Sequence, residues 1–153
     1  MTMDQEKLTQ ALSGMFPDEN ITSTPEETTI KVHPESWHEV ALRLRQDEHL
    51  QFDYLHNLYA IDWQTHFTVV CHMESTGFRH QVTLRTDLPD HDHAELDTLS
   101  DIWITAEYQE REVYDLMGIR FNNHPDPRRL FLDEGWGFPL RKDYQDEINF
   151  IER

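Results

Sequence analysis

The chain of 153 residues contains a single cysteine, Cys71, and no long apolar run. One thiol cannot form a disulfide within the chain, and an iron–sulfur cluster held by this chain alone would need about four thiolates. No stretch approaches the roughly 18 apolar residues of a transmembrane helix. Residues 1–15 are polar and acidic rather than basic and then apolar, so we expect no secretory signal peptide. These absences predict a polypeptide of cytoplasmic type in a reducing compartment.

Positive charge is also scarce. Lys and Arg number 13 against 30 Asp and Glu, which gives a net charge of −17 with the ten His neutral. A protein that contacts nucleic-acid phosphates needs a positive surface, so nucleic acid is excluded as a partner. The five glycines form neither a G-x-G-x-x-G motif nor a P-loop, and no G-x-S-x-G motif occurs. Nucleotide binding and serine-nucleophile hydrolysis therefore have no support.

Apolar residues recur at helical spacing in some segments and alternate in others. In the first part of the chain, these patterns predict a helix over Leu8–Met15, a strand over Thr28–Val32, and a helix that begins at Pro34 and continues to about Leu44. They then predict a strand over Leu58–Trp63 and a hairpin of Phe67–Met73 and Val82–Leu84 with its turn near Ser75–Gly77. Two helices follow, a short one around Asp97–Trp103 and a longer one over Ala106–Met117 that ends at Gly118.

The clustering of strands in the middle of the chain predicts an α+β fold, with helices packed on a central mixed β-sheet. We expect one α+β domain over residues 1–121 and an extended C-terminal tail over residues 122–153, because proline and glycine interrupt that region. Residues 110–143 carry six basic and seven acidic groups, whereas the remainder carries seven basic and 23 acidic groups. The near-neutral tail is where a partner protein can approach, so it is the expected partner-binding segment.

Four carboxylates on the last predicted helix invite an acid/base interpretation: Glu107, Glu110, Glu112 and Asp115. Catalysis would need one desolvated carboxyl with a raised pKa beside a second that stays ionised. The i, i+4 spacing instead places Arg111 between Glu107 and Asp115 on one helical face. Structural ion pairing is therefore favoured over catalysis.

Histidines and arginines form two further candidate sites. His91 and His93 lie next to Asp90 and Asp92 and could collect a metal ion, but without a third spaced ligand a solvated loop is favoured. His124 lies in HPDPRR, where prolines stiffen the backbone and Arg128 and Arg129 present planar groups suited to a partner's carboxylates. A solvated basic turn is an equally good interpretation of that motif. Cys71 falls within an alternating strand and is expected to pack in the core.

Three motifs together resemble a known family. The signature of the 30-kDa (NuoC-type) subunit of respiratory complex I is similar to three motifs of this chain, which are, in order, EREVYDLMGIRF, HPDPRRL and GFPLRKDY. The resemblance extends more faintly upstream of them, so that in total it covers about two thirds of the chain. The matching positions fall into a helix, its glycine stop, a turn and a closing block: Glu110, Arg111, Glu112 and Asp115; Gly118; His124, Pro125, Asp126, Arg128 and Arg129; and Pro139, Leu140, Arg141, Lys142 and Asp143.

The resemblance implies a non-redox accessory subunit in the peripheral arm of a proton-pumping NADH:quinone oxidoreductase, bracing its quinone-reducing module. It implies no catalytic residue, metal or cofactor in this chain, with FMN, iron–sulfur clusters and quinone in partner subunits. The implied partners are the hydrogenase-like large subunit (NuoD-type), the small iron–sulfur subunit (NuoB-type) and the ferredoxin-like subunit (NuoI-type). The resemblance also implies that the chain is a peripheral protein at the cytoplasmic face of the inner membrane. It would contact the membrane only through the complex.

Three alternatives stay open. The same family is represented in ferredoxin- or F420H2-linked dehydrogenases and in membrane-bound hydrogenases, so the complex could be one of these. A free-standing enzyme would use the carboxylates of Glu107–Asp115, and a metal carrier would use His91 and His93. Co-purifying subunits, turnover by the isolated chain, and retained metal respectively distinguish these alternatives.

Overall fold

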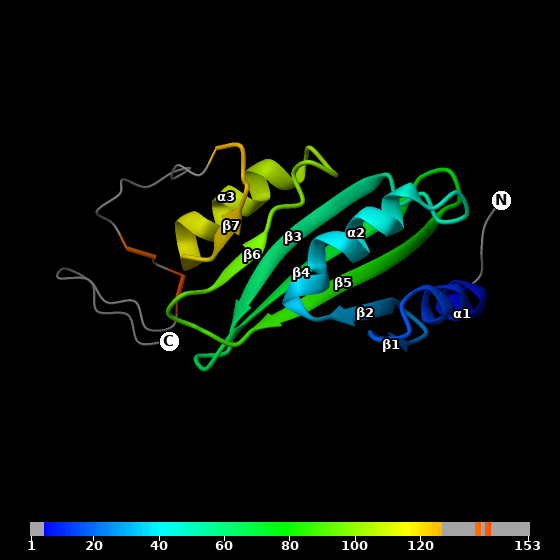
Figure 1. Cartoon of the computed structure of the whole chain (residues 1–153), viewed down its shortest axis with the longest axis horizontal. Coiled ribbons are helices and arrows are strands. Elements are labelled where there is room, and N and C mark those ends of the chain that lie inside the picture. The colour runs from blue at the N-terminus through cyan, green and yellow to red at the C-terminus, as the bar shows by residue number, and fades with distance from the viewer. Residues whose placement is uncertain (1–4, 127–136, 139, 142–153) are drawn as a thin grey trace.

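The computed structural model describes residues 5–126, 137–138 and 140–141. Three α-helices and seven strands follow one another along this part of the chain, with a short 3-10 turn, η1, before the second helix (Figure 1). The elements are α1 (Gln5–Met15), β1 (Asn20–Ser23), β2 (Thr28–Val32), η1 (Pro34–Ser36), α2 (Trp37–Gln46), β3 (Tyr54–Asp62), β4 (Phe67–Ser75), β5 (His80–Leu88), β6 (Glu95–Asp97), α3 (Ala106–Met117) and β7 (Arg120–Asn122).

Five strands form the main sheet in the order β1-β2-β5-β4-β3. Strands β2 and β5 are parallel, whereas the other neighbours are antiparallel. The sheet is therefore mixed, and the predicted α+β fold class is confirmed. A separate two-stranded parallel sheet joins β6 to β7.

Helix α2 covers one face of the sheet (Figure 1). The chain enters it through Pro34, which occupies the first turn of η1, as its fixed φ angle allows. The side chains of Trp37, Val40, Ala41 and Leu44 form the predicted apolar stripe, and all four are buried in the core. Each large apolar side chain buried in this way contributes on the order of 2 kcal/mol to folding.

The β4–β5 hairpin is confirmed, with Phe67 opposite Leu88 and Ser75 opposite His80. The first five residues of β4 are all buried, so this central strand is covered on both faces. Cys71 is one of them, and burial, followed by the nearby Glu110 carboxylate, raises the pKa of its thiol. A buried, protonated thiol is a poor nucleophile, which agrees with the predicted core role.

The predicted helix around Asp97–Trp103 is wrong. Glu95–Asp97 forms strand β6, and the following residues make tight turns, with the N–H groups of Ile102 and Trp103 donating to the carbonyl of Leu99. The buried side chains of Leu96, Leu99 and Trp103 recur at three- and four-residue intervals, which imitates a helix in sequence. Pairing of β6 with β7, far along the chain, decides the outcome.

The other differences concern short or edge elements. Strands β1, β6 and β7 were not predicted because three or four residues carry too little periodicity. Strand β3 begins at Tyr54, four residues before the predicted start at Leu58. The helices over Leu8–Met15 and Ala106–Met117 are confirmed as α1 and α3, and α3 ends at Gly118.

Side chains from α3 and from the turn before it form hydrogen bonds with some of the backbone groups on the outer edge of β3. The hydroxyl of Thr105 donates to the carbonyl of Leu55 at 3.0 Å, and Gln109 accepts a hydrogen bond from the N–H of Leu58. The indole of Trp103 donates to the carbonyl of Phe52 at 2.9 Å. These bonds hold α3 beside the sheet edge, where open backbone groups would otherwise invite aggregation.

Among the residues that the structure describes, no helix is long and apolar enough to cross a membrane.

Candidate functional site

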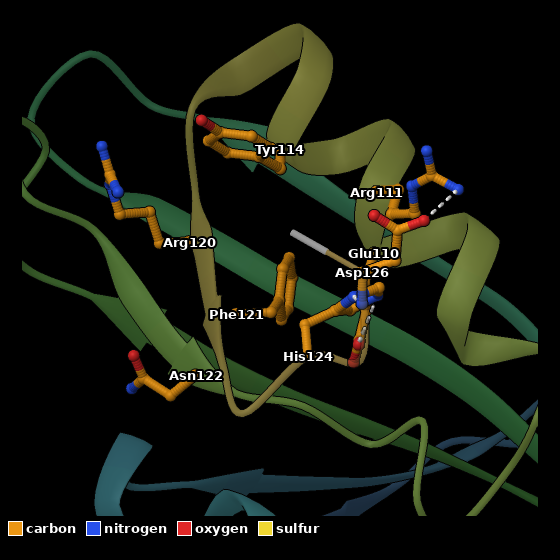
Figure 2. A pocket seen from close by; sticks show the side chains of 8 residues that line it. All are labelled: Glu110, Arg111, Tyr114, Arg120, Phe121, Asn122, His124 and Asp126. Atoms are coloured by element: carbon orange, nitrogen blue, oxygen red, sulfur yellow. Dashed lines mark hydrogen bonds and ion pairs between the residues drawn. The ribbon is translucent and has the colours of Figure 1, made fainter. Parts of the chain in front are cut away.

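The family motifs meet where α3 ends and the chain turns back into β7. Gly118 takes the left-handed conformation (φ 80°), and its N–H donates to the carbonyl of Tyr114 at 2.9 Å. A side chain at this φ is strained, so glycine is the natural residue for the reversal. Strand β7 then carries the chain back along α3 and brings His124 beside Glu110 (Figure 2).

Glu110 is fully buried. One carboxyl oxygen accepts a hydrogen bond from the hydroxyl of Thr98, and the other accepts from the N–H of Leu99 at 2.8 Å. Desolvation raises the pKa of Glu110 to about 7; the two hydrogen bonds oppose this rise and the charge of Asp101 adds to it. Glu110 thus connects the turns after β6 to helix α3.

His124 closes the other side of this carboxyl. Its Nε2 lies 3.7 Å from a carboxyl oxygen of Glu110 and donates to the carbonyl of Glu107 at 3.0 Å. Its Nδ1 accepts a hydrogen bond from the N–H of Asp126 at 3.0 Å. With one ring nitrogen donating and the other accepting, the imidazole is in its neutral form. The side chain is 3% exposed, so His124 faces the body of the protein.

A pocket of about 190 Å³ adjoins these residues (Figure 2). Its lining comes from α3, β7 and the segment after β7: Glu110, Arg111, Tyr114, Arg120, Phe121, Asn122, His124 and Asp126. The guanidinium of Arg111 lies 3.5 Å from the carboxylate of Asp126 and over the ring of Tyr108. The i, i+4 pattern predicted Glu107 and Asp115 as the neighbours of Arg111; it did not predict the ion pair that the structure places between Arg111 and Asp126, a residue that follows β7.

This geometry favours a structural role for Glu110. Its raised pKa meets one condition for acid/base catalysis, but both carboxyl oxygens accept hydrogen bonds and none of the residue reaches solvent. Asp115, the other buried carboxylate of α3, is also fully enclosed. Glu112 lies on the exposed face of the helix. Charge spacing did not indicate which acid would be desolvated, because that depends on β6 and β7.

Part of the closing block lies against the end of α3. The N–H of Leu140 donates to the carbonyl of Leu116 at 2.8 Å, which satisfies a carbonyl in the last turn of the helix. The ring of Phe138 lies 5.8 Å from that of Tyr114 and directly over Gly118. A glycine is therefore needed at position 118 for close approach as well as for conformation.

Arg141 contacts the end of the β-sheet where β4 begins and β5 ends. Its guanidinium donates to Nδ1 of His91 at 2.8 Å and lies 5.7 Å from the centre of the Phe67 ring. Nε2 of His91 faces the buried carboxylate of Asp62 at 2.8 Å, and the imidazole stacks on Phe67 with centroids 4.3 Å apart. Arg141 also lies 3.7 Å from Asp92. The sequence did not indicate that His91 would bind this arginine.

His91 is thus part of a hydrogen-bonded chain with Asp62 and Arg141, whereas His93 is exposed and lies near Asp90. Within the described ranges, no group of three or more His, Cys, Asp or Glu residues is placed to hold a metal ion. Pro125 is exposed. The remaining family positions, Arg128, Arg129, Pro139, Lys142 and Asp143, lie outside the described residues, so their interface role stays a prediction.

Comparison with known proteins identifies the family. The family model of the respiratory-chain NADH dehydrogenase, 30 Kd subunit, matches residues 30–148. The chain belongs to this 30-kDa family. The resemblance stated from the three motifs is confirmed, and the match extends well upstream of them.

Several members of the family are similar in sequence. The C/D subunit of NADH-quinone oxidoreductase from Phocaeicola vulgatus is 46% identical over 122 residues, which cover 78% of this chain and 23% of that protein. The C subunit from Geobacter sulfurreducens is 42% identical over 63% of this chain and 62% of its own length. The C subunit from Burkholderia cenocepacia is 38% identical over 82% and 68% respectively. The chain thus spans about a quarter of the C/D relative.

A solved structure shares the fold. One chain of the membrane-bound sulfane sulfur reductase, an archaeal respiratory membrane complex, superposes with a TM-score of 0.80 over 94% of this chain and 86% of that chain. Its sequence identity is 21%, so the likeness concerns the fold and not the activity.

Replacing Glu110 with Gln should change how stability depends on pH. Glu110 has an ordinary pKa of 4.5 and a folded pKa of about 7, so the folded chain holds this proton more tightly than the unfolded chain. The resulting stability is complete below pH 4.5 and is lost as pH rises through 7. The free energy of unfolding of Glu110→Gln, relative to that of wild type, should therefore rise by roughly 3 kcal/mol as the pH increases from about 5 to about 8. Urea unfolding at a series of pH values measures this change.

The control for this experiment is Glu112→Gln, which removes an exposed carboxylate from the same helix. It should follow the wild-type pH profile to within about 0.5 kcal/mol. Identical profiles for Glu110→Gln and wild type would contradict the assignment of a raised pKa to Glu110.

Replacing Gly118 with Ala should destabilise the chain by about 1–3 kcal/mol, because the backbone is left-handed there and the added Cβ would lie 2.7 Å from the Phe138 ring. Gly14→Ala is the matched control: no atom lies within 4 Å of its added Cβ, and it lies within helix α1. We expect that control to gain about 0.5–1 kcal/mol. Urea unfolding measures both, and equal stability of the two variants would contradict the account of the turn.

Proposed function

We propose that this chain is a non-redox accessory subunit in the peripheral arm of a proton-pumping NADH:quinone oxidoreductase. The match to the 30-kDa family over residues 30–148 is the observation that carries this proposal. The described site supports it, because its titratable groups hold parts of the chain together: Glu110 joins the turns after β6 to α3, and Arg141 joins the closing block to His91. The subunit would act by bracing the quinone-reducing module.

The proposed direct partner is the hydrogenase-like large subunit of NuoD type. Some relatives carry the joint designation C/D, and this chain matches about a quarter of such a protein. Two subunits that occur in one polypeptide are held together at high effective concentration, which suits portions that pack against each other. The proposed set of neighbours also includes the small iron–sulfur subunit and the ferredoxin-like subunit.

The cofactors of the reaction, FMN, iron–sulfur clusters and quinone, would be bound by partner subunits, and the complex would place this chain at the cytoplasmic face of the inner membrane. No catalytic residue is assigned to this chain. The enzyme activity is that of the assembled translocase, so we expect no turnover of NADH by the isolated chain.

Co-purification tests this proposal. An affinity-tagged copy of the chain, expressed in its native host and extracted from membranes in mild detergent, should retain the large subunit, the small iron–sulfur subunit and an NADH-binding flavin subunit, identified by mass spectrometry. Retention of the large subunit without an NADH-binding subunit would favour a ferredoxin- or F420H2-linked complex. Absence of the large subunit would contradict the proposal.

Charge reversal in the HPDPRR motif should weaken assembly. Arg128→Glu replaces a group suited to partner carboxylates with a repelling one, and we expect several-fold less large subunit per tagged chain. Arg141 is less suitable for this purpose because its guanidinium binds His91 within the chain. Arg79→Glu, in the exposed β4–β5 turn, is the charge-matched control and should assemble as wild type. Equal loss in both variants would indicate a general charge effect and contradict a local contact.

A further inference from the structure

Strand β3 is an edge of the main sheet, and no other strand among the described residues covers its outer side. The N–H of Leu58 points away from β4, because it donates to the side chain of Gln109. In an antiparallel pair the direction of the backbone groups repeats every second residue, so the N–H and C=O of Ala60 point the same way. The structure gives these two groups of Ala60 no hydrogen-bond partner within the part of the chain that it describes.

An apolar groove runs beside this open edge. It lies between β3 and α3, has a volume of about 150 Å³, and is lined mainly by aliphatic side chains, namely Leu58, Ala60, Val113, Leu116, Met117 and Leu140. Small-molecule sites usually measure ~300–1,000 Å³, so this space is too small for such a ligand and suits an inserted side chain. Open strand groups beside an apolar groove are the combination that binds an extended peptide.

The charge of the groove indicates what kind of peptide it fits. Glu112 lies at its rim, on the exposed face of α3, and the other polar lining groups are uncharged, among them Gln109 and Asn57. The whole chain carries a net charge of −17. A peptide segment that fits this groove therefore has an apolar residue for the apolar lining and, next to it in sequence, a Lys or Arg that faces Glu112. An acidic segment would be repelled by the negative charge of the chain.

The position of the groove points to the same partner as the proposed function. Leu140 lines the groove, and the family match ends eight residues later, at residue 148. In C/D relatives the C and D portions share one polypeptide, and this chain corresponds to a minor part of it. Leu140 thus places a residue from the last ten positions of the family match at the groove.

We propose that the groove between β3 and α3 binds a short extended segment of the hydrogenase-like large subunit. The backbone of that segment pairs with the N–H and C=O of Ala60, an apolar side chain enters the groove, and a neighbouring basic side chain faces Glu112. The inference rests on the proposed function, which supplies the identity of the partner.

Two variants at one position test this pairing. Ala60→Pro removes the outward N–H and adds atoms at the edge, while the ladder to β4 is kept because that N–H does not belong to it; proline is tolerated at such edge positions. Ala60→Ser keeps the N–H and a small side chain. When the large subunit is expressed together with each variant, we expect Ala60→Pro to retain about tenfold less of it, and Ala60→Ser to retain the wild-type amount.

Hydrogen exchange on the unaltered chain provides a second measurement that does not depend on how a variant folds. The amide of Ala60 should exchange quickly in the isolated chain and become protected in the complex with the large subunit. Protection already present in the isolated chain would overturn the proposal, since the chain itself would then cover the edge.

The outcomes separate this inference from the proposed function. If the wild-type chain retains the large subunit, Ala60→Pro retains it equally and the Ala60 amide stays unprotected, the groove proposal is overturned while the proposed function stands. If the wild-type chain retains no large subunit, both proposals fail together.

Discussion

The buried carboxyl of Glu110 is the interaction on which the C-terminal half of this chain depends. It accepts hydrogen bonds from Thr98 and the backbone of Leu99, and the neutral ring of His124 covers its other side. An unpaired buried carboxylate would cost several kcal/mol, so these partners must be in place when α3 packs. The arrangement therefore fixes the turns after β6, helix α3 and the chain beyond β7 relative to one another.

A second arrangement of the same kind lies at the other end of α3. Gly118 permits both the left-handed reversal and the close approach of Phe138, and the N–H of Leu140 satisfies a carbonyl of the last helical turn. Arg141 continues this contact by binding His91, which is itself held by Asp62. In a chain with a net charge of −17, Arg141 also places a positive charge 3.7 Å from the carboxylate of Asp92.

The elements that could be predicted from the sequence are those with a long periodic pattern of apolar residues. Helices α1, α2 and α3 and the β4–β5 hairpin are the long elements with a sustained apolar pattern, and all of them were predicted. Strands β6 and β7 are three residues each, and the segment after β6 imitates a helix, so it was assigned incorrectly. In the site, charge spacing indicated ion pairs on α3, but it could not indicate that Arg111 would pair with Asp126.

Fold class, family and the order of the motifs follow from the amino-acid sequence alone, because hydrophobic periodicity and motif order can be read along one dimension. The folded chain was needed to show which carboxylate is buried, which arginine binds within the body, and where the sheet edge has no partner among the residues that the structure describes. Each of these depends on contacts between residues distant along the chain, such as Glu110 with Thr98 or Leu58 with Gln109. Burial sets the electrostatics of such groups, and burial exists only once the chain has folded.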